Sequence, residues 1–248
     1  MRSDLAERVK IAIVAAIERE IKPLVRNWVE VDREYEGRSY KFFESNEAVL
    51  VCGGIGPAPA RRATEAVITL YKPYLVQSVG FAGALDGTGT VGDVVVPSRV
   101  VDATDGSSFA IDNGQGTLVS IASTAAAEQK AKLAVAYRAQ FVDMEAAAVA
   151  RGAEARGIAF GAMKVISDEM DFALPELDRF VSHDGQFKSG RFVLYSAIRP
   201  WLWTRILKLA RHSSLAAYAM CRVLEEQLSH GDILKNMNNG LHPIATRK

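Results

Sequence analysis

The sequence predicts an α/β fold with three layers, in which a central mixed, mostly parallel sheet is flanked by helices on both faces. The run VKIAIVAAI (9–17) is continuously apolar and rich in Val and Ile, which is typical of a strand buried on both faces. Similar runs alternate with segments of helical spacing, and the connections between them are short. With 248 residues, 49% of them hydrophobic, the chain can form one large domain with a substantial core.

The first half of the chain is expected to alternate strands with helices. Pro23 fits the first turn of its helix, turns are expected near Glu36–Gly37 and Asn46, and the Gly/Ala-rich sequence GFAGA is expected to form a turn after its strand. In chain order, the pattern predicts a strand over 9–17, a helix over 18–28, paired strands over 33–45 and 48–56, a helix over 60–73 that ends near Pro73, and a strand over 74–85.

The second half continues the alternation and then becomes helical. The polar segment 104–117 is expected to be a loop, and Thr124 is expected to cap the helix that it begins. We expect a single domain over 1–230 with a helical extension at 187–230, split near Arg199–Pro200, and then a polar, flexible tail over 231–248. The elements predicted before the extension are strands over 92–104 (broken at Pro97) and 118–123, a helix over 124–139, a strand and helix within 141–157, and a strand over 158–171.

Composition excludes several classes of function. The formal net charge is +1, from 30 basic and 29 acidic residues, which does not favour a nucleic-acid-binding protein. Cys52 and Cys221 belong to no CxxC or Cys/His cluster, so two free thiols in a reducing cytoplasm are expected, with a disulfide between them as the alternative. No signal peptide is expected, and no apolar stretch reaches the roughly 18 residues of a membrane span. The four histidines follow no metal-ligand spacing, so no metal or other cofactor is expected.

Several polar or aromatic side chains follow the carboxyl ends of predicted strands, where open α/β sheets bind their ligands. Carboxylates that converge there without a metal set indicate acid/base chemistry on a small polar substrate. Each position also has a structural explanation, because acids favour a helix start and Ser–Asp fits an N-cap. The residues are Glu18, Glu20, Phe81, Asp143, Glu145, Ser167 and Asp168.

The order of these motifs resembles that of the nucleoside phosphorylase and nucleosidase superfamily (purine or other phosphorylase family 1). The motifs are A-x-E-x-E-I near the start, GGIG, G-x-A-G-A, V-D-M-E-A and I-S-D, and the resemblance runs from about residue 9 to residue 171. The pair VDMEA and ISD is its most specific part, and it is similar to that of the 5′-methylthioadenosine/S-adenosylhomocysteine nucleosidases. The resemblance implies a nucleoside phosphorylase-like fold and an N-glycosidase that releases adenine from an adenosine-type nucleoside.

The resemblance also implies a role for individual residues. Glu20 is expected to act as the general base on the attacking water, and Asp168 as the general acid that protonates the leaving base at N7, with Ser167 helping to place it. Glu145 is expected to accept hydrogen bonds from the ribose 2′ and 3′ hydroxyls, and Met144 to pack on the sugar. Asp143 is expected to be structural.

Departures from the motifs bear on the nucleophile and on base recognition. The phosphorylases of the superfamily carry an Arg and a hydroxyl where this chain has Ser78 and Phe81, which favours water over phosphate. Lys164 stands where the methylthioadenosine nucleosidases carry an arginine. The base-stacking phenylalanine of that branch is absent from SIASTA (120–125), and Phe81 or Phe172 is expected to replace it.

Two other functions stay open at this point. One is a phosphate-dependent phosphorylase in which Lys164 and a mobile Arg61 or Arg62 supply the anion contacts. The other is a catalytically weakened nucleoside-binding protein.

The C-terminal part resembles the hopanoid-associated branch of the superfamily, which implies a lipid-tailed adenosyl-hopanoid as an alternative substrate. The segment RPWLWTRILKLARHS mixes Trp201, Trp203 and leucines with basic residues, and this pattern favours transient contact of residues 199–212 with a membrane surface. An ordinary amphipathic helix, packed on the sheet or on a dimer partner, is the alternative. By resemblance alone, a homo-oligomer is expected.

Overall fold

The computed structural model of the chain describes residues 11–87, 89–170, 180, 182, 185, 188 and 203–230, with only the backbone described for 203–206 and 230. Several predictions therefore lie outside the described residues. They concern the helix break at Arg199–Pro200, the side chains of Trp201 and Trp203, the aromatic ring of Phe172, and the tail over 231–248.

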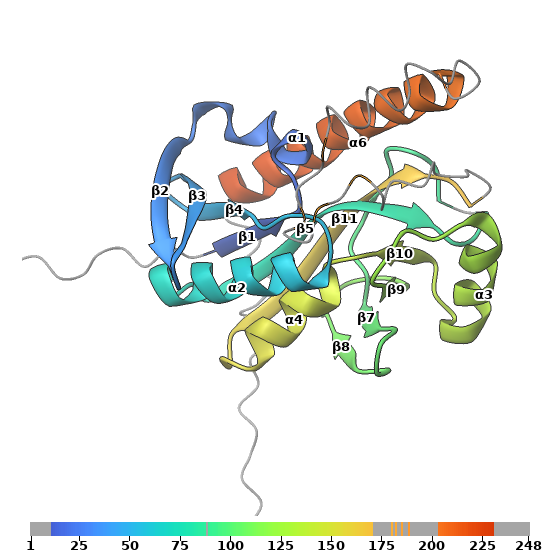
Figure 1. Ribbon diagram of the computed structural model, residues 1–248, viewed down its shortest axis with the longest axis horizontal. Helices are drawn as coiled ribbons and strands as arrows, with labels where there is room; N and C mark the ends of the chain where they lie inside the picture. The colour runs from blue at the N-terminus through green and yellow to red at the C-terminus, as the bar shows by residue number, and fades with distance from the viewer. Residues whose placement is uncertain are drawn as a thin grey trace, which may run out of the picture.

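Within the described chain, one mixed sheet of 11 strands forms the middle of the molecule (Figure 1). Its order is β2-β3-β4-β1-β5-β10-β9-β7-β8, with β11 beside β5 and β6 beside β11. The central pairings of β1 with β4 and β5, and of β5 with β11, are parallel, whereas β2, β3 and β8 pair antiparallel at the edges. The strands are β1 (Ile11–Ala15), β2 (Val29–Tyr35), β3 (Arg38–Glu44), β4 (Ala48–Cys52), β5 (Leu75–Ala84), β6 (Val94–Val95), β7 (Arg99–Asp102), β8 (Ser108–Ala110), β9 (Thr117–Ser120), β10 (Phe141–Asp143) and β11 (Ala159–Asp168).

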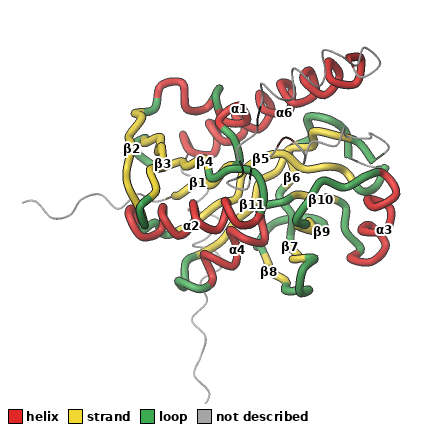
Figure 2. Tube along the Cα trace, viewed as in Figure 1, coloured by secondary structure: helices red, strands yellow, loops and turns green. Residues whose placement is uncertain are grey.

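Helices cover both faces of the sheet, as the three-layer prediction requires (Figures 1 and 2). On one face, α2 (Pro57–Tyr71) and α4 (Ala146–Glu154) lie side by side. On the other face, the long helix α6 (Trp203–His230) crosses β5 and β11 and contacts α1 (Glu18–Ile21) and the 3-10 helix η1 (Leu24–Asn27). Helix α3 (Ala127–Tyr137) packs beside β9.

The buried strand β1 shows why the sheet needs helices on both faces. Alternate side chains of a strand point to opposite faces. Ile11 and Ile13 accordingly join a buried cluster with Met220 of α6, while Ala12 and Val14 join a separate cluster with α2 and α4. A continuous apolar run is therefore the expected sequence for this strand, and its prediction is confirmed.

Three local predictions are wrong. The predicted helix over 18–28 divides at Pro23 into one turn of α-helix and one 3-10 turn, because Pro23 has no N–H with which to continue the first helix. The segment 104–117, predicted as a loop, contains the edge strand β8, which pairs with β7. Thr124 does not cap α3, whose N-cap is Ala126 with no side-chain hydrogen bond.

The sequence GFAGA is also not a turn. Residues 80–84 continue β5 as an extended strand in parallel register with β11. Both cysteines are free thiols, as expected. Among the described helices, none combines the length and the apolar character that crossing a bilayer would require.

Candidate active site

A cavity of about 610 Å³ opens at the carboxyl ends of β1, β5, β10 and β11, the edge at which the sequence places its acids. Seven of the residues singled out from the sequence line it, and helix α6 closes one side with Leu209, Ala210 and Ser213. The predicted residues in the lining are Glu20, Phe81, Asp143, Met144, Glu145, Ser167 and Asp168.

Glu20 is a buried carboxylate without a full set of hydrogen-bond partners. It lies in α1, directly after β1, and among the described residues its Oε2 atom has no partner. Burial, reinforced by the negative charge of Glu145, raises the pKa of Glu20 from 4.5 to about 8. A carboxyl group with a pKa near neutrality can accept and return a proton at physiological pH.

Glu145 shares the cavity with Glu20 but has a backbone partner. Its Oε1 accepts a hydrogen bond of 2.8 Å from the N–H of Gly56, which belongs to the GGIG turn after β4. Burial, together with the charge of Asp143, raises the pKa of Glu145 to about 7. The side chain of Glu145 forms part of the cavity wall.

Asp143, two residues before Glu145, is built into the scaffold. Its Oδ2 accepts 2.8 Å from the N–H of Ala146, the first residue of α4, and lies 2.8 Å from Nζ of Lys164. Its Oδ1 accepts a hydrogen bond from the hydroxyl of Ser120. These contacts cap α4 and neutralise a buried lysine, as the structural expectation for Asp143 requires.

Lys164 lies behind the cavity wall rather than in it. Its side chain is 1% exposed, and its ammonium group contacts Asp143 and donates 3.0 Å to the hydroxyl of Ser78 on β5. Burial lowers the pKa of Lys164, but the charges of Asp143 and Glu145 outweigh burial and raise it. Lys164 therefore stays charged, and its positive charge partly neutralises Asp143 and Glu145 from behind the cavity wall.

Asp168 ends β11 with both carboxylate oxygens engaged. Oδ1 accepts 2.7 Å from the hydroxyl of Ser167, and Oδ2 lies 2.5 Å from Nζ of Lys130 in helix α3. Ser167 and Asp168 belong to a strand, so the N-cap explanation for this pair does not hold at these positions. The cavity thus holds two different carboxyl groups. Glu20 has a raised pKa, and Asp168 lies beside the ammonium group of Lys130.

Lys130 is the site residue that the sequence analysis missed. It lines the cavity although its side chain is only 1% exposed. A signal was present, because Lys130, Leu133 and Tyr137 follow helical spacing on the buried side of α3, where an apolar residue would be usual. A lysine on an apolar stripe is a candidate for a buried ion pair.

The remaining predictions divide between the cavity and the surface. Phe81 and Met144 lie in the cavity wall, together with Ile121 and 123–125 from the SIASTA segment. Glu18 points away from the cavity, half exposed and 3.8 Å from Lys41. Arg61 is exposed and pairs with Glu65 along α2.

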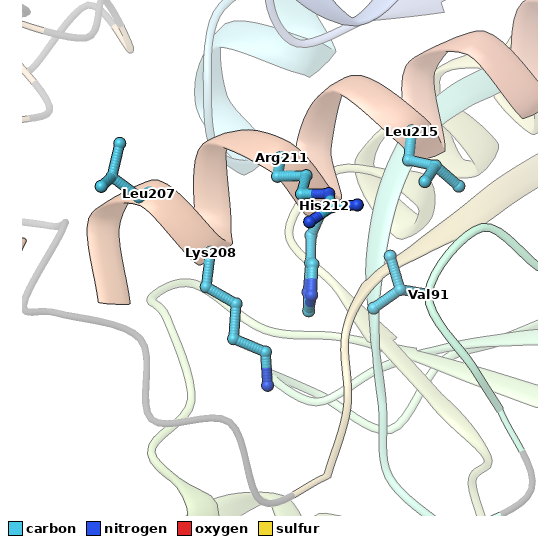
Figure 3. A pocket seen from close by; sticks show the side chains of 6 residues that line it. All are labelled: Val91, Leu207, Lys208, Arg211, His212 and Leu215. Carbon is cyan, nitrogen blue, oxygen red and sulfur yellow. The ribbon is translucent and has the colours of Figure 1, made fainter. Parts of the chain in front are cut away.

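Helix α6 also borders a second hollow on its other side (Figure 3). This basic-apolar groove is lined by Val91 and by side chains from two turns of α6. Leu207 and Leu215 are exposed large apolar residues in it. The α6 residues of the groove are Leu207, Lys208, Arg211, His212 and Leu215.

Comparison with known proteins identifies the family of the chain. The family model of the phosphorylase superfamily matches residues 10–126 and 115–190. The 5′-methylthioadenosine/S-adenosylhomocysteine nucleosidase of Bacillus licheniformis is 32% identical over 95 residues, which are 37% of this chain and 41% of that protein. The chain thus spans less than half the length of the curated relatives that it matches.

Two solved structures share the fold over most of both chains. The futalosine hydrolase of Helicobacter pylori superposes with a TM-score of 0.68 at 16% identity, over 90% of this chain and 98% of that one. The 5′-methylthioadenosine/S-adenosylhomocysteine nucleosidase of Colwellia psychrerythraea, solved in complex with adenine, gives 0.67 at 20% identity, over 90% and 96%. Since the superfamily model covers well over half of the sequence, the chain belongs to the phosphorylase superfamily.

Proposed function

We propose that this protein is a purine nucleosidase that hydrolyses the N-glycosidic bond of an adenosine-type nucleoside and releases adenine. The observation that carries the proposal is the buried carboxylate of Glu20. Its pKa is raised to about 8, one of its oxygens has no partner among the described residues, and it shares one cavity with Glu145 and Asp168. The similarity to nucleosidases supports the class of reaction.

Glu20 would be the general base. The attacking water would donate a hydrogen bond to the carboxylate of Glu20, whose side chain lines the cavity. The water oxygen bonds to the anomeric carbon while Glu20 takes its proton. The raised pKa makes the ionised form of Glu20 a stronger base than an ordinary carboxylate, so we expect the rate to increase as the pH rises toward about 8.

Asp168 would be the general acid for the departing base. Cleavage of a glycosidic bond builds positive charge on the sugar and negative charge on the leaving group. A proton delivered by Asp168 to a ring nitrogen neutralises the leaving base, and Ser167 holds the carboxyl group in place through its 2.7 Å hydrogen bond.

Glu145 and Met144 would hold the ribose between these two groups. One oxygen of Glu145 is fixed by the N–H of Gly56, so the carboxylate has a defined orientation toward a vicinal diol. Met144 offers an adaptable apolar contact for the sugar face. Phe81, in the same wall, is our candidate for the aromatic contact with substrate.

Water is favoured over phosphate as the nucleophile because of the charges around Glu20. A phosphate anion would meet Glu20 and Glu145. The cations that line the same cavity are Arg19, which is exposed, and Lys130, which is already paired with Asp168. The ammonium group of Lys164 lies outside the cavity wall and is bound to Asp143 and Ser78. Of the two arginines named for a phosphorylase, Arg61 is exposed and paired with Glu65, and neither Arg61 nor Arg62 lines the cavity.

The proposal also covers the 5′ substituent of the substrate, the oligomeric state of the protein and its location in the cell. A methylthio group, a homocysteine or a hopane tail would share the ribose and base contacts, and Leu209 and Ala210 of α6 would face it. The lipid tail would connect the enzyme with hopanoid biosynthesis. We also propose a cytoplasmic homo-oligomer that touches membrane surfaces transiently through residues 199–212.

The proposal is tested by adenine release in phosphate-free buffer. We expect methylthioadenosine or adenosylhomocysteine to yield adenine, and added phosphate to leave the rate unchanged. Glu20→Gln and Asp168→Asn should each lower kcat by about 100-fold or more, the usual scale of acid or base catalysis. Glu18→Gln is the matched control, since Glu18 is half exposed and lies outside the cavity.

Two outcomes would overturn the proposal in different ways. Release that requires phosphate and yields ribose 1-phosphate would make the protein a phosphorylase. Binding of adenine nucleosides without release, equal in the native protein and Asp168→Asn, would make it a binding protein. A nucleoside with a long 5′ alkyl chain, compared with methylthioadenosine, would distinguish a lipid substrate from a small one.

A further inference from the structure

The ion pair of Lys130 and Asp168 is buried inside the candidate active site. The side chains are 1% and 6% exposed, and Nζ of Lys130 lies 2.5 Å from Oδ2 of Asp168 and 2.8 Å from the carbonyl oxygen of Glu169. Both residues line the cavity, one from α3 and the other from the end of β11. The pair therefore sits where a substrate would be bound, not in the hydrophobic core.

The strand beside the pair leaves room for it. A Cβ atom on Gly83 of β5 would lie 2.8 Å from Oδ2 of Asp168 and 3.3 Å from Nζ of Lys130. The other charged side chains in the cavity wall come from α1 and from the end of β10, and Lys164 lies behind them. They are Arg19, Glu20, Asp143 and Glu145.

This pairing has a chemical consequence for the acid. A carboxylate that accepts from both an ammonium group and a hydroxyl is stabilised in its ionised form. An ionised Asp168 has no proton to give. The pair as a whole does carry one, on Nζ of Lys130, at the distance at which a proton passes directly between two heavy atoms.

We propose that Lys130 is a positioning residue that stores the proton for Asp168 and passes it on during cleavage. This inference rests on the proposed nucleosidase function. As the N-glycosidic bond breaks, its electron pair moves to the base. Asp168 gives a proton to a nitrogen of the base, and the proton on Nζ of Lys130 moves to Asp168. The water that attacks the anomeric carbon loses its proton to Glu20, and that proton returns through solvent to Lys130.

A lysine suits this role and an arginine does not. The ammonium group of lysine can lose its proton in a buried site, whereas the guanidinium group stays protonated in proteins. Each oxygen of Asp168 has a second lone pair beyond the one used by Ser167 or Lys130, so the carboxyl group can hold a proton toward the substrate without giving up either contact.

The test compares Lys130→Arg and Lys130→Met on two substrates. An adenosine-type nucleoside needs a protonated leaving base. A 4-nitrophenyl riboside does not, because nitrophenolate is a stable anion. We expect both variants to lose about 100-fold in kcat for adenine release, while nitrophenol release stays within about threefold. Lys132→Met, on the exposed side of the same helix, is the matched control and should behave as the native protein.

The comparison of the two substrates separates proton storage from a purely structural role, because a structural defect would slow both reactions alike. Lys130→Arg keeps the buried charge, so the test survives a failure of Lys130→Met to fold.

The inference and the proposed function fail in different ways. If Lys130→Arg releases adenine at the native rate, Lys130 supplies only charge and the inference is wrong. If both substrates slow equally in both variants, Lys130 is structural and the inference is again wrong. If the native protein releases neither adenine nor nitrophenol, the proposed function itself is wrong.

Discussion

Asp143 and Glu145 stand two positions apart in one motif, yet they have different surroundings. Asp143 accepts from the N–H of Ala146 and from Ser120 and lies against Lys164. Glu145 accepts from Gly56 and faces the cavity. The strand β10 ends between them, so one side chain turns into the scaffold and the other into the site.

We expect the two residues to differ when each is replaced by its amide. Glu145→Gln should lower kcat/KM by about 10- to 100-fold, the scale of a charge-assisted hydrogen bond, with little effect on stability. Asp143→Asn should instead destabilise the fold by about 3 kcal/mol, because it leaves a buried lysine without its counter-charge. Steady-state kinetics and thermal unfolding measure the two effects. Equal effects of the two changes on binding would contradict this division.

Glu20 also predicts how stability depends on pH. Its pKa rises from 4.5 to about 8 on folding, so between these values the folded state binds more protons than the unfolded one. The contribution of Glu20 to stability is fully present below about pH 4.5 and is lost as the pH rises through about 8. Its limiting slope is about 1.4 kcal/mol for each pH unit.

Glu20→Gln should therefore flatten the loss of stability that the native protein shows as the pH rises across this range. Denaturant unfolding at several pH values measures the slope, and Glu18→Gln, two residues away and half exposed, is the control. The slope will not vanish, because the pKa of Glu145 is also raised, to about 7. An unchanged slope in Glu20→Gln would show that Glu20 is ionised at neutral pH in the folded state.

At the level of elements, the strand β5 is buried in the sheet and carries glycines where it passes the candidate active site. Gly80 and Gly83 lie opposite the carboxylates of Glu20 and Asp168, and a Cβ on either would come within 3.0 Å of one of them. The glycines of GFAGA thus make room for acids that reach across the strand from neighbouring elements.

Gly83→Ala should reduce adenine release more than it reduces stability. The added Cβ, 2.8 Å from Asp168, would push a side chain rather than backbone, so the carboxyl group shifts while the sheet is kept. We expect a loss in kcat of about 10- to 100-fold, since small misplacements of catalytic groups are costly. Gly161→Ala in the neighbouring strand is the matched control, because its nearest contacts would be at 3.7 Å and 3.8 Å. Equal kinetics in the two variants would show that Asp168 need not hold its position.

Features that depend on residues close together in the sequence were predicted, whereas features that depend on contacts between distant residues were not. The elements β1, α2 and β11 were predicted because their patterns of apolar residues are local. The strand conformation of GFAGA was not predicted. Its glycines leave space for the side chains of Glu20 and Asp168, which belong to distant parts of the sequence. Lys130 was missed for the same reason, since its partner lies 38 residues away.

At the scale of the whole molecule, α6 connects the core, the cavity and the surface. Met220 and Leu224 are buried against the sheet, which is the packing that an ordinary amphipathic helix would have. Leu209 and Ala210 line the candidate active site. Other side chains of the same helix line the basic-apolar groove (Figure 3).

This arrangement predicts salt-dependent binding to anionic vesicles. Lys208 and Arg211 supply positive charge next to the exposed Leu207, and each basic residue near an anionic surface contributes about 1 kcal/mol. The double variant Lys208→Glu/Arg211→Glu should therefore co-sediment with phosphatidylglycerol vesicles at least about 10-fold less than the native protein. The matched control, Arg61→Glu/Lys132→Glu, changes the net charge equally on α2 and α3 and should bind as the native protein does. Equal loss in both variants would mean that only net charge matters. Absence of native binding, with a dimer in solution that the groove variant dissociates, would make this face of α6 a contact between copies of the chain.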